Sequence, residues 1–124
     1  MEWIEIKPGE DGQSGEAAVR FPASAQVFAG HFPHRPILPG VVLIDTAVSI
    51  VAKISGRPLR LAELANVKFV SPVEAEQEIR FAFRAEPDPA APGRIRVKGR
   101  WSRGEDKIAE MQFAAAEEGG SHGA

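Results

Sequence analysis

Hydrophobic and polar residues alternate along much of the chain, and this alternation predicts strands near both ends. A period of two places one row of side chains against a core and the other row in solvent. Stretches rich in Gly, Pro, Asp and Ser separate the alternating runs and predict turns. The predicted strands are residues 2–7, 16–21, 64–70, 76–86, 94–102 and 107–117.

One apolar segment interrupts this pattern near the middle of the chain. Residues 41–55, VVLIDTAVSIVAKIS, are apolar nearly all the way round a helical wheel, which predicts a helix buried on most sides. The β-branched residues would also suit a strand, but about fifteen residues is long for one. Gly56, with Pro58 two residues later, is expected to end the helix. The order of elements predicts an α+β fold, with one long helix packed on an antiparallel sheet.

A segment with four prolines and two glycines, residues 22–40, joins the second strand to the helix. Because each proline fixes its own φ and biases the preceding residue away from helix, an ordered irregular loop is expected, with one helical turn at residues 24–28. The last residues, GGSHGA (119–124), predict a disordered tail. Residues 1–118 then form a single domain of ordinary size.

Composition and charge exclude several classes of function. The chain has no cysteine, so disulfides, a thiol nucleophile and a cysteine zinc site are impossible. The absence of disulfides and of a recognisable secretory signal favours the cytoplasm. A net charge of −2 gives no general attraction to nucleic acid, and no apolar run is long enough to predict a membrane span. The histidines at positions 31, 34 and 122 predict no metal site.

Candidate chemistry is concentrated in residues 30–45, GHFPHRPILPGVVLID. Gly40 begins the predicted helix, whose unpaired N–H groups and partial positive charge can stabilise negative charge on a carbonyl oxygen. Asp45 is the only acid in the helix and stands among apolar residues, where desolvation favours the protonated form of a carboxyl. His31 precedes the proline-rich part of the loop, and imidazole titrates near neutral pH. From the residues alone, a structural role is the more common one for a histidine in an apolar loop, and it remains open for Asp45 as well.

The same string closely resembles the signature of the bacterial 3-hydroxyacyl-acyl-carrier-protein dehydratases of the hotdog superfamily. Weaker similarity extends from Val19 to about Gln77. Many members of that family carry Glu at the position of Asp45, whereas the 3-hydroxydecanoyl dehydratase-like and aryl polyene dehydratase-like branches carry Asp. The residues that match the signature are Gly30, His31, Phe32, Pro33, Pro36, Pro39, Gly40 and Asp45.

The resemblance implies a hotdog fold and the dehydration of a 3-hydroxyacyl thioester to a trans-2-enoyl thioester, with no cofactor and no metal. It implies that His31 is the catalytic base, that the Gly40 N–H binds the thioester carbonyl, and that Asp45 assists departure of the hydroxyl group. It further implies a dimer in which each site takes its histidine from one subunit and its acid from the other. A homodimer or higher homo-oligomer is expected, with a heterodimer as the alternative.

Further residues are expected to contact the substrate or its carrier, acyl carrier protein, which is acidic. Ser49 stands where the familiar dehydratases usually carry Gln, so the acyl group remains open. The apolar residues near the helix are expected either to line an acyl tunnel or to pack the core; they are Phe28, Leu38, Val41, Val42 and Val48. The expected substrate contacts are Phe28, Phe32, Pro39, Val41 and Ser49. Basic candidates for carrier docking are Arg35, Arg57, Arg60 and Lys68.

Three other functions remain open at the level of sequence. A hotdog thioesterase would also use a helix carboxylate, but with water as the nucleophile. A non-catalytic subunit would complete the site of a partner in a dehydratase heterodimer. An isomerase that moves the double bond would need the same base and acid.

Overall fold

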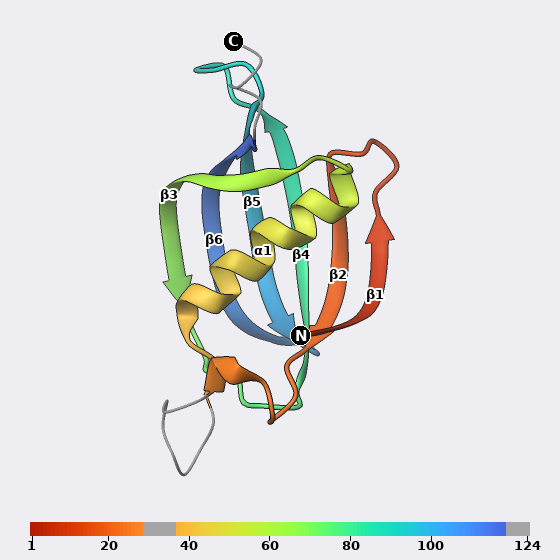
Figure 1. Ribbon diagram of the computed structural model, residues 1–124, viewed down its shortest axis with the longest axis vertical. Helices are drawn as coiled ribbons and strands as arrows, with labels where there is room; N and C mark the ends of the chain where they lie inside the picture. The colour runs from red at the N-terminus through yellow and green to blue at the C-terminus, as the bar shows by residue number, and fades with distance from the viewer. Residues whose placement is uncertain (29–36, 119–124) are drawn as a thin grey trace.

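The alternation in the sequence is realised as six antiparallel strands that curve around a single helix (Figure 1). The computed structural model describes residues 1–28 and 37–118. The strand order is β1-β2-β4-β5-β6-β3, so β1 and β3 form the two edges of the sheet. The elements are β1 (Glu2–Pro8), β2 (Ser14–Arg20), η1 (Gln26–Phe28), α1 (Gly40–Ser55), β3 (Leu59–Phe69), β4 (Glu78–Pro87), β5 (Arg94–Arg103) and β6 (Asp106–Glu117).

The core forms between α1 and the inward-facing rows of the sheet. β4 and β5 alternate regularly between buried and exposed residues, as the sequence pattern predicts. Gly99 in β5 leaves room for the Phe81 ring, since a Cβ on Gly99 would lie 2.1 Å from the end of that ring. The largest fully buried side chains are Trp101, Phe81, Phe113, Ile50, Ile79, Ile108 and Met111.

The central helix is buried or half-buried over most of its circumference and exposed along one stripe. Gly56 ends it at a φ of 69° and donates its N–H to the Ala52 carbonyl, as predicted. The expected burial does not hold along this stripe, whose residues lie one helical turn apart and are exposed in this chain. They are Val41, Asp45, Ser49 and Lys53. No helix in the described parts of the chain has the length and hydropathy that crossing a membrane requires. The buried residues of α1 are Leu43, Ile44, Thr46, Ala47, Val48, Ile50 and Val51.

One strand departs clearly from its predicted bounds. β3 begins at Leu59 rather than at residue 64, while the other five strands lie within two residues of prediction. The register of β3 against β6 shifts between Leu61 and Glu63 and again between Leu64 and Asn66. Each bulge inserts an unpaired residue and interrupts the two-residue period that reveals a strand in sequence. The bent strand starts beside the end of α1, runs across the upper end of the sheet in this view and then follows its edge (Figure 1).

Candidate active site

The start of α1 provides the backbone donors expected of the site. Pro39 precedes the helix in an extended conformation, with φ −62° and ψ 142°, and its side chain offers no acceptor to the first N–H groups. The Val42 N–H donates to the Pro39 carbonyl at 3.0 Å. Gly40 is the first helical residue, where unpaired N–H groups and the helix dipole favour negative charge.

A largely apolar hollow of about 430 Å³ lies at this helix end. Phe69 packs closely on Gly40, because a Cβ on Gly40 would lie 2.7 Å from the end of the Phe69 ring. Ser71, a polar residue of the lining, donates its hydroxyl to the Lys107 carbonyl at 2.7 Å. The hollow therefore suits an acyl group whose carbonyl reaches the helix start. Its lining residues are Ile37, Leu38, Gly40, Leu43, Phe69, Val70, Ser71, Pro72 and Val73.

Replacing Gly40 with Ala is expected to lower the free energy of unfolding by about 1 kcal/mol, because the added methyl group overpacks the contact with Phe69. This loss of stability is small for an overpacked contact, because Phe69 is half exposed and its ring can tilt away from the added methyl group. Equilibrium denaturation measures the loss. The double variant Gly40→Ala/Phe69→Leu should recover most of it, and an unchanged stability of Gly40→Ala would show that the close approach has no cost.

Asp45 does not line this hollow in the single chain. Its side chain is exposed on α1, between Val41 and Ser49 along the same stripe. The Ser49 hydroxyl donates to the Asp45 backbone carbonyl at 3.2 Å rather than to the carboxylate. The desolvation expected around Asp45 is therefore not supplied by this chain, and a second chain would have to cover the stripe.

Several predicted residues lie outside the described part of the chain. These are the proposed base His31, the substrate contact Phe32 and the docking candidate Arg35, together with His34, His122 and the predicted tail, residues 119–124. Among the residues that are described, no group of three His, Asp or Glu side chains could hold a metal ion.

The remaining predicted substrate contacts divide between the core and the surface. Phe28, Leu38 and Val48 belong to the hydrophobic core, and Val42 packs against it. Pro39 leads into the helix, whereas Val41 is 61% exposed beside Asp45. Sequence reasoning assigned only Leu38 and Gly40 of the lining to the site and missed the others, among them Leu43, Phe69 and Val70. The sequence feature that could have indicated Phe69 and Val70 is that two apolar residues follow each other at 69–70, where the alternation of the strand stops.

The described docking candidates, Arg57, Arg60 and Lys68, do not lie together on one patch. Arg57 lies at the far end of α1, where its Nε donates to Glu117 Oε1 at 2.8 Å. Arg60 and Lys68 lie near opposite ends of the bent strand β3. Lys68 alone of these three lies at the end of the sheet where α1 begins, and its side chain lines a hollow on the outer face of the sheet.

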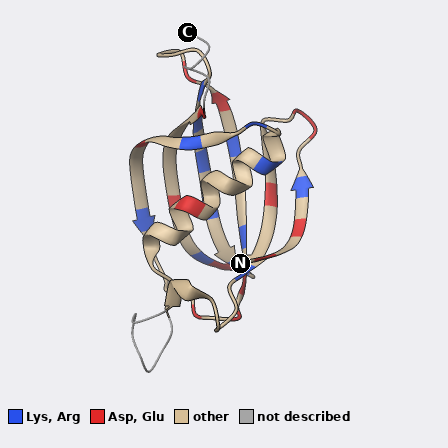
Figure 2. Ribbon diagram, viewed as in Figure 1, with Lys and Arg blue, Asp and Glu red and all other residues tan. Residues whose placement is uncertain are grey.

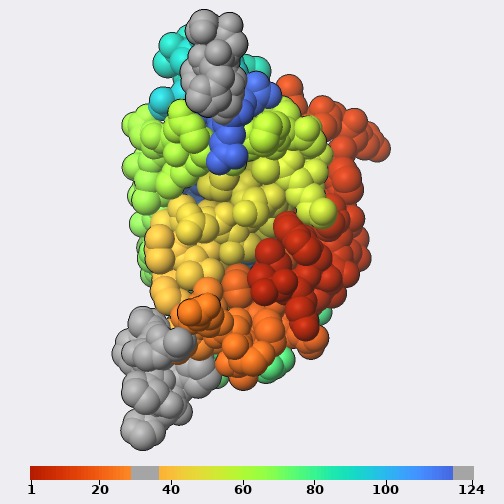
Figure 3. Space-filling model, viewed as in Figure 1, coloured from red at the N-terminus to blue at the C-terminus, as the bar shows by residue number. Residues whose placement is uncertain are grey.

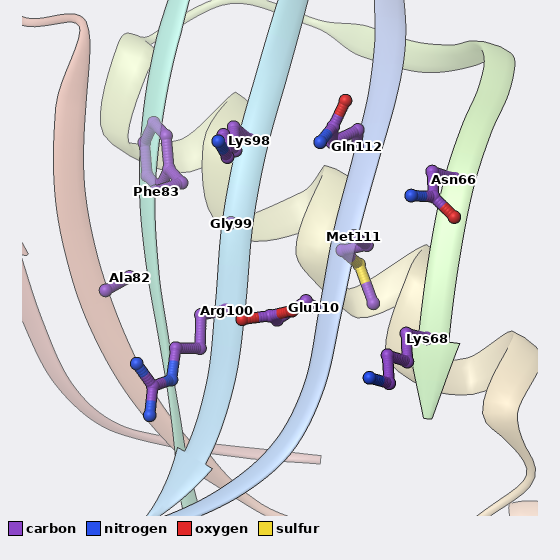
Figure 4. A pocket seen from close by; sticks show the side chains of 10 residues that line it. All are labelled: Asn66, Lys68, Ala82, Phe83, Lys98, Gly99, Arg100, Glu110, Met111 and Gln112. Carbon is purple, nitrogen blue, oxygen red and sulfur yellow. The ribbon is translucent and has the colours of Figure 1, made fainter. Parts of the chain in front are cut away.

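A larger hollow of about 560 Å³ lies on the outer face of the sheet (Figure 4). Charged side chains surround it, including Lys98, Arg100 and Glu110, while α1 lies behind the sheet in this view. A hydrogen bond from Lys107 holds the pKa of the Glu110 carboxyl below its usual range. Charged residues of both signs occur across the sheet (Figure 2), and the sheet separates this hollow from the start of the helix.

Comparisons with known proteins agree with the resemblance in the signature. Residues 7–113 match the ApeI-like family model, which is described as ApeI dehydratase. A 3-hydroxyacyl-[acyl-carrier-protein] dehydratase FabZ from Rhizobium johnstonii is 41% identical over 64 residues, covering 46% of this chain and 41% of the relative. A FabZ from a Caulobacter species is 29% identical over 97 residues, covering 71% and 58%. The chain spans about half the length of these curated relatives.

Solved structures agree with the fold. A chain of the dehydratase heterocomplex ApeI:P from Xenorhabdus doucetiae superposes with a TM-score of 0.72 at 19% identity, covering 94% of this chain and 100% of that one. The uncharacterized protein PH1136 from Pyrococcus horikoshii superposes with a TM-score of 0.68 at 15% identity, covering 94% and 81%. The predicted hotdog fold, one long helix wrapped by an antiparallel sheet, is confirmed.

Proposed function

Because the chain belongs to the ApeI-like dehydratase family, we propose that it dehydrates a 3-hydroxyacyl thioester, carried by acyl carrier protein, to a trans-2-enoyl thioester. The observation that carries this proposal is the apolar hollow at the start of α1, where Gly40 is the first helical residue. An apolar cavity with a few convergent polar groups is the usual form of a site for an acyl ligand.

In the proposed reaction, His31 removes a proton from C2 as the general base. The Gly40 N–H stabilises the negative charge that develops on the thioester oxygen. Asp45 donates a proton to the C3 hydroxyl, which leaves as water while the C2–C3 double bond forms. His31 ends with one extra proton and Asp45 with one fewer, so a proton returns from base to acid before the next turnover.

We infer that the working unit is a dimer joined at β3. β3 is an edge strand, whose unpaired backbone groups are available to another strand. Exposed apolar side chains lie along it and at its end, including Leu61, Leu64 and Phe69. Figure 3 shows the surface of α1 uncovered between β3 and β1. A second chain paired at this edge would cover the Asp45 stripe and bring its own acid towards the hollow.

We propose a homodimer as the first choice, with a related second chain as the alternative. The solved Xenorhabdus protein is named as a heterocomplex, which makes the alternative concrete. Light scattering on the purified chain separates the two, since a homodimer requires twice the mass of one chain.

The purified chain is expected to convert a 3-hydroxyacyl thioester on acyl carrier protein into an enoyl product. Enoyl absorbance follows the reaction across a series of acyl lengths, and product analysis detects any isomerised double bond. Release of free thiol would instead support the thioesterase. Turnover that appears only after a partner chain is added would support the non-catalytic subunit.

We also propose that Lys68, whose side chain lines the hollow on the outer face of the sheet, contributes to carrier docking, because it lies at the end of the sheet where α1 begins and carries a charge opposite to that of the carrier. Binding of the carrier is expected to weaken as the salt concentration rises, since exposed charges are screened. Affinity that does not change with salt would remove this part of the proposal.

A further inference from the structure

Glu76, in the loop between β3 and β4, has an unusual backbone conformation. Its φ is +70°, and it is the one non-glycine residue with a positive φ in the described part of the chain. Glycine adopts this left-handed region freely, whereas a side chain with a Cβ is disfavoured there. Such strain persists where the surrounding contacts hold the residue in place.

The contacts of Glu76 reach the chain that leaves β2. Its backbone N–H donates to the Phe21 carbonyl at 2.8 Å. Its carboxylate oxygen Oε2 accepts the Ala23 N–H at 2.7 Å. One residue therefore holds Phe21 and Ala23 at once, through its backbone and through its side chain.

These contacts are continued by local hydrogen bonds that lead to the core. The Ala25 N–H donates to the Pro22 carbonyl at 2.9 Å, and the Phe28 N–H donates to the Ala25 carbonyl at 3.1 Å. Phe28 is 7% exposed and belongs to the hydrophobic core. The stretch from Phe21 to Phe28 is thus fixed at both ends, by Glu76 and by the core.

The same loop holds the chain that enters α1. The Leu38 N–H donates to the Val73 carbonyl at 2.8 Å. Ile37 and Glu74 form an isolated antiparallel bridge. Gly40 follows two residues after Leu38, so this contact also places the start of the helix. The loop and both of these stretches lie at the end of the sheet where α1 begins (Figure 1).

The loop is itself attached to the sheet. Arg103, at the end of β5, donates from Nη1 to the Pro72 carbonyl and to Gln77 Oε1, at 3.0 Å in each case. Gln77 Oε1 also accepts the Glu74 N–H at 2.9 Å. The loop can therefore act as a fixed support for the two stretches that it contacts.

We propose that Glu76 is a positioning residue, which holds Phe21–Ala23 on the same loop that holds Ile37 and Leu38. The loop that contains Glu76 then holds the described residues on both sides of the stretch that carries His31, and it also holds the start of α1. The catalytic consequence rests on the proposed function, because it assumes that His31 is the base. The strained backbone is retained because it points the N–H and the carboxylate of Glu76 at the same stretch.

Two substitutions test the acceptor that the Glu76 side chain supplies. Glu76→Gly relieves the strain and removes the acceptor, whereas Glu76→Gln keeps an oxygen acceptor at the same length. In Glu76→Gly, hydrogen exchange at Ala23, Ala25 and Phe28 is expected to accelerate about five-fold, the size expected for loss of one hydrogen bond, while the unfolding midpoint is kept or raised. Its kcat should fall by a similar factor with KM nearly unchanged. Glu76→Gln should remain close to the wild type in each measurement.

The outcomes that overturn the proposal are distinct from failure of the proposed function. Unchanged exchange at Ala23, Ala25 and Phe28 in Glu76→Gly would overturn it, and so would Glu76→Gln behaving like Glu76→Gly. Equal acceleration at amides throughout β4, β5 and β6 would also overturn it, because it would show a general loss of stability. A wild-type chain without dehydratase activity would contradict the proposed function, while hydrogen exchange would still decide the role of Glu76.

Discussion

Replacing His31 with Ala is expected to lower kcat about a thousandfold, within the range that a general base contributes. Alanine has no group that can remove the C2 proton, while the hollow at the start of α1 remains able to bind the acyl chain. KM should therefore change little. The measurement is enoyl absorbance under saturating 3-hydroxyacyl carrier protein, with circular dichroism to confirm that the variant is folded.

The matched control is His34→Ala, three residues further along the same proline-rich stretch. It removes an imidazole from the same stretch of the sequence and should leave kcat close to the wild-type value. A near-normal rate in His31→Ala, or equal losses in the two variants, would show that His31 is not the base.

The strands in the middle of the sheet follow the alternation of the sequence closely. β4 and β5 have neighbours on both sides and one buried face, so burial alternates with the period of the chain. β3 was harder to predict because it lies at an edge and contains two bulges, so most of its residues are exposed. Polar and apolar residues alternate in a strand because one of its faces is buried. β3 is bent and buries few residues, so its alternation is weak.

The residues proposed for the site came from the signature, but the placement of Asp45 could not be predicted from it. The composition of α1 predicted that Asp45 would be surrounded by apolar residues, whereas the single chain leaves it exposed beside Val41. The hydropathy of a helix indicates that its surface will be buried, but it does not indicate whether the same chain or a second chain buries it. In the same way, charges that are close in sequence at Arg60 and Lys68 lie near opposite ends of β3.

Glu76 shows a different limit of sequence reasoning. Glutamate gives no local signal for a left-handed backbone, which usually marks glycine or asparagine. Its partners Phe21 and Ala23 are more than fifty residues away along the chain, so the contact depends on the tertiary fold. Residues that support a site in this way become visible only when the loops are placed in space.

Replacing Asp45 with Asn is expected to lower kcat about a hundredfold or more, as expected for loss of a general acid. Asparagine keeps the size of the side chain but cannot release a proton to the departing hydroxyl. Asp106→Asn is the matched control, because Asp106 is an exposed acid at the start of β6. A rate close to the wild type in Asp45→Asn would remove Asp45 from the mechanism.

Mixing the two inactive variants tests whether the site is shared between subunits. If each site takes His31 from one chain and Asp45 from the other, a mixed dimer of His31→Ala and Asp45→Asn keeps one intact site. Random exchange of subunits makes half of the dimers mixed, so about one quarter of the wild-type rate should return, as the symmetry of a two-fold dimer requires. Complete absence of recovery, with subunit exchange verified by mass spectrometry, would place both residues of each site on a single chain. The exposure of Asp45 in the isolated chain would then require an explanation other than a shared site.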